Sequence, residues 1–129
     1  MRIDKLTSKL QSALVDAQSM ALGADNNFIE SCHLLLTLLD QKGGSVRPLL
    51  SQTGFDIADL RAKLQTLVDN LPKLQDSSGE ISVSGDLTKI LNQADKIAQQ
   101  KGDAFVSSEI ILLVAMKDSG AVGKLLNSY

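Results

Sequence analysis

The chain carries an internal repeat, and this repeat limits the folds that are open to it. Residues 25–33 read Asp-Asn-Asn-Phe-Ile-Glu-Ser-Cys-His, and residues 102–110 read Gly-Asp-Ala-Phe-Val-Ser-Ser-Glu-Ile. Their phenylalanines, Phe28 and Phe105, lie 105 − 28 = 77 positions apart. Each copy follows an amphipathic stretch and precedes a strongly apolar one. Two copies are too few to stack as a solenoid, so we expect their apolar faces to close on each other.

The first 40 residues predict two helices joined by a short loop. Apolar residues at three- and four-residue steps form one stripe over residues 6–21, which is typical of an amphipathic helix. Asp4 is the expected N-cap, and Gly23 the expected left-handed end. Phe28 and Ile29 are expected to plug the core. Ser31 is the expected cap of a second helix, whose body at 34–39 is apolar nearly all round and therefore central.

The next 30 residues predict a short helix and a longer one. Gly43-Gly44 breaks the second helix, and Ser45 begins a short helix. Its residues expected to face inward are Val46, Leu49 and Leu50. Asp56 is the expected cap of a further helix that Pro72 stops, and residues 73–83 form a polar joining segment.

The second half repeats the first. Apolar positions between 87 and 98 match those between 10 and 21, and residues 111–113 match 34–36. Residues 122–126 match 46–50 at an offset of 76, so one residue is lost between them. We therefore predict an all-α, pseudo-twofold bundle of about 7–8 helices in one domain over residues 1–129. Repeat one covers about 4–54, a bridging helix 56–71, a linker 72–83, and repeat two 84–129.

Composition excludes several classes of function. Aromatic residues make up only 3% of the chain, so Leu, Ile, Val and Ala must build the core. The formal charge of −2 and the lack of a basic patch argue against nucleic acid as a partner. No apolar run reaches the roughly 20 residues that span a membrane, and the N-terminus has no signal-peptide core. We expect a cytoplasmic protein that binds no membrane.

Catalytic motifs are scarce. Cys32 and His33 are adjacent, but neighbours on a helix point about 100° apart, so a structural role is expected for both. A small hydrolase built on this pair is the alternative, and it predicts loss of activity on thiol alkylation. There are too few ligands for zinc and there is no Gly-x-x-x-x-Gly-Lys-Ser/Thr loop. We expect no enzyme activity, no metal and no cofactor in this chain.

Comparison of the two copies points to a candidate binding surface. Cys32-His33 aligns with Glu109-Ile110, so Ile110 is an apolar residue where the other copy is polar. Leu91 lies at the edge of its helix's apolar arc, and we expect Leu91 and Ile110 to line one shallow groove. The alternative is that both belong to the core.

Three polar residues have structural explanations as well as functional ones. Glu109 falls in the first turn of a helix, where the helix dipole favours a carboxylate. Asp103 is a natural loop residue, and Thr7 can bond a backbone group locally.

Several motifs in the correct order resemble the N-terminal domain of the ClpB disaggregase, and the resemblance covers essentially the whole chain. Those motifs are Met1-Arg2-Ile3-Asp4-Lys5-Leu6-Thr7, Ala17-Gln18-Ser19-Met20-Ala21-Leu22-Gly23, Phe28-Ile29-Glu30, His33-Leu34-Leu35, Gly43-Gly44-Ser45-Val46 and the 102–109 stretch. The related ClpA and ClpC N domains share the two-repeat helical pattern. The resemblance implies a single Clp N-terminal domain.

The resemblance also implies a function and a set of site residues. ClpB is a bacterial AAA+ chaperone, a homohexamer that extracts polypeptides from aggregates with ATP and the DnaK system. The ATPase modules, with their ATP and magnesium, lie downstream of the N domain, and the isolated domain is expected to be monomeric. The family's client groove maps onto Leu91, Gln93 and Ile110, and its functionally important polar positions map onto Thr7, Asp103 and Glu109. Gln93 departs from the apolar residue expected there, which implies a smaller or more polar groove.

These observations leave two functional hypotheses. In the first, an apolar groove binds unfolded or aggregated polypeptide weakly and hands it to the AAA+ ring. In the second, the polar residues receive a folded adaptor, as the N domains of ClpA and ClpC do.

Overall fold

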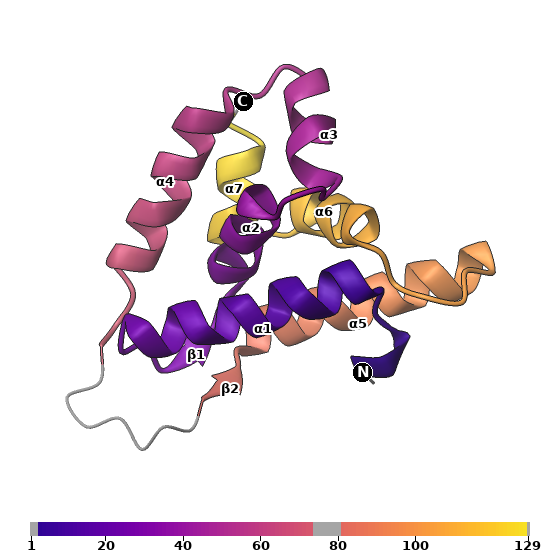
Figure 1. Cartoon of the computed structure of the whole chain (residues 1–129), viewed down its shortest axis with the longest axis horizontal. Helices are drawn as coiled ribbons and strands as arrows, with labels where there is room; N and C mark the ends of the chain where they lie inside the picture. Colours follow the sequence, from indigo (N-terminus) through magenta and orange to yellow (C-terminus); the bar gives the residue numbers. More distant parts are fainter. Residues whose placement is uncertain (1–2, 74–80, 129) are drawn as a thin grey trace.

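The order of elements in the computed structural model reproduces the repeat. The structure describes residues 3–73 and 81–128. Within them the first half holds α1 (Ser8–Gly23), α2 (Ser31–Asp40) and α3 (Val46–Gln52), and α4 (Ile57–Asp69) bridges to the second half. The second half holds α5 (Gly85–Lys101), α6 (Ser108–Lys117) and α7 (Ala121–Leu126) (Figure 1). A 3-10 helix, η1 (Ile3–Lys5), precedes α1, and two short strands, β1 (Phe28–Ile29) and β2 (Ser82–Val83), form a parallel pair.

Two backbone pairings hold the two halves together, and we call them the clasp. The residues of one pairing lie 77 positions from those of the other. Ile29 lies opposite Val83, and Leu6 lies opposite Val106, both in parallel. Because 6 + 77 = 83 and 29 + 77 = 106, these are the same contact made once by each half. The backbone N–H of Ser84 donates to Ile29 O and that of Thr7 donates to Val106 O, both at 3.0 Å. The predicted pseudo-twofold bundle is confirmed. We call residues 77 positions apart repeat-equivalent.

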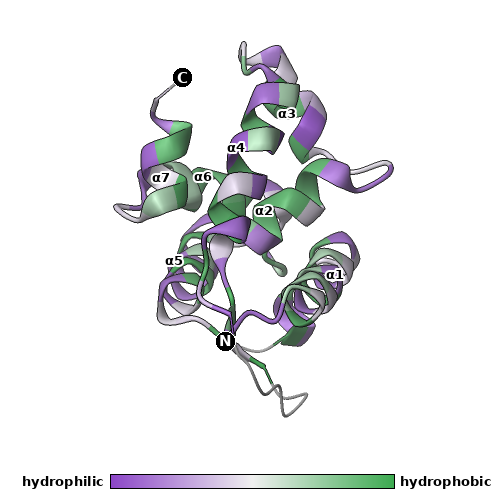
Figure 2. Ribbon diagram, turned by 90° about the vertical axis from the view of Figure 1, so that its left-hand side faces the viewer, coloured by the Kyte–Doolittle hydropathy of each residue, from purple (hydrophilic) through white to green (hydrophobic). Residues whose placement is uncertain are grey.

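Helix α2 forms the centre of the molecule, as predicted. Its residues from Cys32 to Leu39 are all buried, and it packs against α1, α3, α4 and α6. Figure 2 shows α2 in the middle of the bundle, with α1 and α5 below it. Helix α4 is tied to the end of α2 by Arg61, whose Nε and Nη2 lie 2.8 and 2.7 Å from the two carboxylate oxygens of Asp40. The expected cap of α4 is confirmed, since Asp56 accepts from the Asp59 N–H.

The start of α1 differs from the prediction. Asp4 lies in η1, and the N-cap is Thr7, whose Oγ1 accepts from the Leu10 N–H at 3.3 Å. The clasp explains the shift, because pairing with Val106 keeps Leu6 and Thr7 out of a helical conformation between η1 and α1. Its repeat-equivalent Ser84 caps α5 in the same way, accepting from Leu87 N–H at 3.0 Å.

The residue with left-handed backbone conformation after α1 also differs from the predicted Gly23. The helix ends at Gly23, as expected, but the positive φ belongs to Asp25 (58°). The repeat-equivalent Gly102 has φ 74° and closes α5. The turn therefore occupies the same place in both halves, and sequence reasoning put it two residues early in the first.

The prediction that Phe28 and Ile29 both plug the core is right for Ile29 and wrong for Phe28. Phe28 and Phe105 are 48% and 53% exposed, whereas Ile29 and Val106 are buried. These residues are extended, and successive side chains of an extended chain point to opposite sides, so only the second residue of each pair enters the core.

Two smaller predictions also fail. Helix α2 is capped by Glu30 instead of Ser31, because His33 three residues later accepts from the Glu30 N–H and completes a capping box. In α3, Val46 and Leu50 are buried but Leu49 is 38% exposed. Most of the predicted linker, residues 74–80, lies outside the described residues.

Candidate functional site

A hollow opens where the first turns of α1 face α5. It has a volume of about 210 Å³ and is lined by Ile3, Leu6, Leu14, Val83, Thr88, Leu91 and Asn92. We call it the axial hollow. Leu6 and Val83 are repeat-equivalent, and so are Leu14 and Leu91, because 14 + 77 = 91. The axial hollow therefore lies on the pseudo-twofold axis that relates the two halves.

The axial hollow has an aliphatic floor and one strongly exposed apolar side chain. Leu6 is 1% and Leu91 is 8% exposed, so both form the floor and neither projects from it. Ile3, in the 3-10 helix, is 62% exposed. The geometry suits contact with apolar side chains from outside, and the residues that line the hollow include no Asp, Glu, His, Cys or Lys side chain that could act as a general base.

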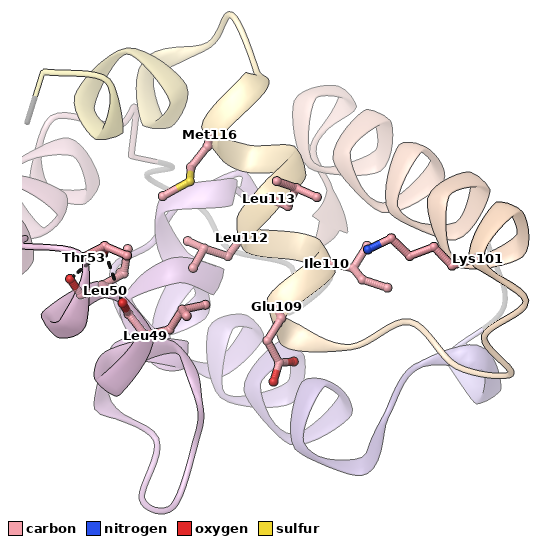
Figure 3. Close-up of a pocket in the computed structure, with 9 residues that line it drawn as sticks. All are labelled: Leu49, Leu50, Thr53, Lys101, Glu109, Ile110, Leu112, Leu113 and Met116. Atoms are coloured by element: carbon pink, nitrogen blue, oxygen red, sulfur yellow. Dashed lines mark hydrogen bonds between the residues drawn. The ribbon is translucent and has the colours of Figure 1, made fainter.

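A second hollow lies between α3 and α6. It has a volume of about 320 Å³, and Figure 3 shows the residues that line it: Leu49, Leu50, Thr53, Lys101, Glu109, Ile110, Leu112, Leu113 and Met116. We call it the α3–α6 groove. Leu49 and Leu113 are 38% and 37% exposed, so the apolar walls reach the surface.

The structure separates the residues expected to form one site. Leu91 lines the axial hollow, whereas Ile110, which is 7% exposed, lines the α3–α6 groove. Gln93 is exposed on α5 and is among the lining residues of neither hollow. Thr7 is the α1 cap, half-buried beside the clasp, and Asp103 is exposed in the loop after α5.

Glu109 is fixed at one end of the α3–α6 groove. A hydrogen bond from its own backbone N–H holds the pKa of its carboxyl below the usual range, and the hydroxyls of Ser45 and Ser107 act in the same direction. Partial burial opposes this shift. Ser45 is the residue that precedes α3, and Ser107 caps α6, so Glu109 links the starts of the two helices that wall the groove.

The hydrogen bonds and burial of Cys32 and His33 in the core favour structural roles for both residues. The Nδ1 of His33 accepts from the Glu30 N–H at 2.8 Å, so the ring proton is on Nε2, which donates to Asn26 Oδ1 at 2.9 Å. Burial raises the pKa of the Cys32 thiol to about 11. The thiol is therefore protonated near neutral pH and both ring nitrogens are engaged, which disfavours a nucleophile–base pair.

Residues 3–73 and 81–128 contain no group of three or more His, Cys, Asp or Glu side chains arranged to hold a metal ion. In the same part of the chain, no helix combines the length and apolarity needed to cross a bilayer.

Sequence reasoning missed three exposed apolar residues that border the two hollows: Ile3, Leu49 and Leu113. The spacing of Leu49 and Leu113 along their helices is that of core residues, so the pattern alone predicts inward positions for both. One signal was present for Ile3, which precedes the first helix and so lies outside its apolar stripe.

The chain matches the family model described as the Clp repeat (R) N-terminal domain over residues 5–129. It is 57% identical over 128 residues to the chaperone protein ClpB of Pseudomonas putida and 46% identical over 129 residues to that of Vibrio cholerae. These matches cover 99% and 100% of this chain but only 15% of each relative.

Solved structures share the fold at lower identity. The N-terminal domain of the ClpV1 ATPase from Escherichia coli superimposes with a TM-score of 0.85 at 22% identity, covering 96% of this chain and 78% of that one. A ClpV N-domain in complex with a VipB peptide gives 0.78 at 21% identity, covering 98% and 79%. The family model, the ClpB relatives and the clasped helical repeat agree: this chain belongs to the Clp repeat N-terminal domain family.

Proposed function

We propose that this chain is the client-recognition domain of an ATP-dependent disaggregase of the ClpB type. It binds unfolded or aggregated polypeptide weakly at the axial hollow and passes it to the downstream ring. The observation that carries the proposal is the axial hollow itself, an open aliphatic depression with the exposed Ile3 at its side. The ClpB relatives, which are chaperones by name, support it.

The size of the axial hollow favours weak binding. A client segment that covers about 300 Å² of apolar surface gains roughly 7 kcal/mol at about 25 cal/mol per Å². Lost rigid-body freedom opposes this by about 4–15 kcal/mol. Several N domains on one ring raise the avidity by about 10²- to 10⁴-fold without new contacts. Weak capture by each domain suits a client that must afterwards be released.

The remaining parts of the activity belong to the longer protein. Its ATP and magnesium would be held by AAA+ modules outside this chain, since these 129 residues contain no Gly-x-x-x-x-Gly-Lys-Ser/Thr loop. Assembly as a homohexamer, partnership with the DnaK system and a cytoplasmic location are parts of the same proposal.

Amide shift mapping with a permanently unfolded protein tests the proposal. We expect shifts around Leu6, Leu14, Val83 and Leu91 that saturate only at high client concentration. Ile3→Ser should weaken binding with little change in Tm, because Ile3 is already 62% exposed. Leu91→Ser is a poorer test, because a residue that is 8% exposed also contributes to stability.

Val15→Ser is the matched control for Ile3→Ser. Val15 is 61% exposed on α1 and lines a different, more polar hollow with Ser8, Gln11, Ser12 and Asp16. Equal binding by wild type, Ile3→Ser and Val15→Ser would remove the axial hollow as the client site.

Docking of a defined partner is the second candidate. It is favoured by the related ClpV N-domain, whose structure is described as a complex with a VipB peptide. The exposed carboxylates of Asp103 and Glu109 would then contribute to recognition. An absence of shifts with the unfolded protein, together with clear shifts around these residues with a folded adaptor, would favour docking.

A further inference from the structure

The polar side chains that line the axial hollow all lie on one wall. Five of its seven lining residues are aliphatic. The other two, Thr88 and Asn92, are exposed residues of α5 that lie four positions apart and therefore on the same face of the helix. Within residues 3–73 and 81–128 the structure gives neither side chain a hydrogen bond. The axial hollow thus combines an aliphatic floor with hydrogen-bonding groups along α5.

The α1 side of the axial hollow is different. The repeat-equivalents of Thr88 and Asn92 on α1 are Gln11 and Val15, and neither is among the lining residues. The Nε2 of Gln11 already donates to the carbonyl of Leu6 at 2.9 Å, and the Leu6 N–H donates to a carbonyl of η1 at 3.0 Å. The backbone at Leu6 is therefore engaged within the chain. Of the two helices beside the hollow, α5 is the one whose lining residues can hydrogen-bond to a client.

The spacing of these two residues matches that of an extended chain. Figure 1 shows α1 and α5 extending in roughly the same direction, and Figure 2, turned by 90°, shows both nearly end-on. A segment lying between them therefore follows α5. Four residues of helix advance by about 6 Å, and two residues of extended chain advance by about 6.6 Å. Thr88 and Asn92 can therefore meet the main-chain groups of alternate client residues.

The amide of Asn92 suits a main-chain peptide group. It carries two N–H donors and one carbonyl acceptor, so it can bond to the N–H and the C=O of one client residue at once. A client peptide group that leaves water for an aliphatic wall without such a partner loses hydrogen bonds, and this opposes binding. Rotation about χ2 exchanges the oxygen and nitrogen of the amide, so Asn92 can serve a chain of either direction.

We propose that Asn92, together with Thr88, makes the axial hollow select polypeptide whose main-chain N–H and C=O groups are unpaired. The helices and sheets of a folded protein have these groups paired already, so they offer Asn92 no partner. The axial hollow would then prefer an extended, unfolded segment to a folded surface of equal apolarity. This inference rests on the proposed function, since it places the client in the axial hollow.

Asn92→Leu separates recognition of the main chain from purely apolar binding. The substitution keeps the approximate size and branching of the side chain and removes its hydrogen bonds. A blocked peptide with a Leu-Val-Leu centre should bind this variant about 5-fold more weakly than wild type, the effect of about one net hydrogen bond. A purely apolar hollow would instead gain surface, so equal or tighter binding by Asn92→Leu would overturn the inference.

Gln93→Leu is the matched control for Asn92→Leu. Gln93 is exposed on the same helix but does not line the axial hollow. The Gln93→Leu variant should bind the peptide as wild type does. A loss as large as that of Asn92→Leu would overturn the inference, because the effect would then not depend on the hollow.

Ester analogues of the peptide test for the hydrogen bond itself. Three analogues each replace one amide of the Leu-Val-Leu centre by an ester, which removes one N–H and keeps the shape of the chain. At least one should bind wild type about 5-fold more weakly than the parent peptide, and should bind Asn92→Leu within about twofold of the parent. No loss on wild type with any ester, or equal losses on both proteins, would overturn the inference.

Amide shifts with the parent peptide distinguish this inference from the proposed function. Shifts around Leu14 and Leu91 in wild type are expected, and their absence would contradict the client site and the role of Asn92 together. Shifts at these residues with undiminished binding by Asn92→Leu would leave the client site in place and overturn only the role of Asn92.

Discussion

At the scale of single residues, His33 makes stability depend on pH. Burial lowers its pKa below the ordinary value of 6.5, and its neutral ring holds the cap of α2. Above about pH 6.5 both states are neutral, but below it the unfolded chain binds a proton that the folded chain resists. Stability should therefore fall as pH drops below 6.5, by up to about 1.4 kcal/mol per pH unit.

Urea unfolding at pH 7, 6 and 5 measures this loss for wild type and for His33→Gln. Glutamine can still accept from the Glu30 N–H, as in a capping box, but it does not titrate. The difference between the two proteins should shrink as pH falls to 5. A constant difference would contradict a buried neutral histidine.

Gly123 is required by close packing at the start of α7. An added Cβ would collide with the backbone oxygen of Asp118 and would lie 2.7 Å from its carbonyl carbon. Gly123→Ala should therefore lower the free energy of unfolding by about 2 kcal/mol or more. Gly85→Ala is the control, because no atom lies within 4 Å of its added Cβ, and it should stabilise by about 0.4–1 kcal/mol. Equal urea midpoints for the two variants would refute the contact.

At the scale of elements, the N-caps give the polar residue Thr7 a structural role. Thr7→Ala and Ser84→Ala should each lower the free energy of unfolding by about 1 kcal/mol, because each removes the acceptor for a first-turn N–H. Thr7→Ser keeps the hydroxyl and should cost only a few tenths of that. The urea unfolding midpoints of the three variants, compared with wild type, measure these losses. If Thr7→Ala unfolds like wild type, Thr7 must matter through a partner outside the domain.

The elements also show what a sequence can and cannot predict here. Helical spacing located the helices and the central place of α2, because a 3.6-residue period survives in the order of apolar residues. The clasp was missed, because each pairing takes only one or two residues and leaves no period in the sequence. That omission produced the errors at Phe28 and at Asp4, the expected cap of α1, and both result from extended backbone nearby. The candidate site was predicted less well: Leu91 and Ile110 each border a hollow, but which hollow depends on helix packing that spacing does not contain.

At the scale of the whole molecule, the two hollows differ in how they relate to the two repeated halves. The axial hollow lies where the halves meet and receives repeat-equivalent residues from both. The α3–α6 groove lies between α3 of the first half and α6 of the second, and no two of its lining residues are repeat-equivalent. One bundle therefore offers a nearly symmetric surface and an unsymmetric one.

The near symmetry of the axial hollow has a consequence for the clients proposed above. A half-turn about the pseudo-twofold axis exchanges Leu14 with Leu91 and reverses the direction of any extended chain lying across the opening. A blocked peptide with a Leu-Val-Leu centre between unlike polar flanks, and the same peptide written in reverse order, should therefore bind with affinities within about threefold, or about 0.7 kcal/mol. Ile3, Thr88 and Asn92 have no repeat-equivalent among the residues that line the hollow, and they set the small remaining preference. Amide shift titrations of both peptides measure this ratio. A ratio above about tenfold would show that the halves do not act as equivalents, and binding of neither peptide would contradict the client site itself.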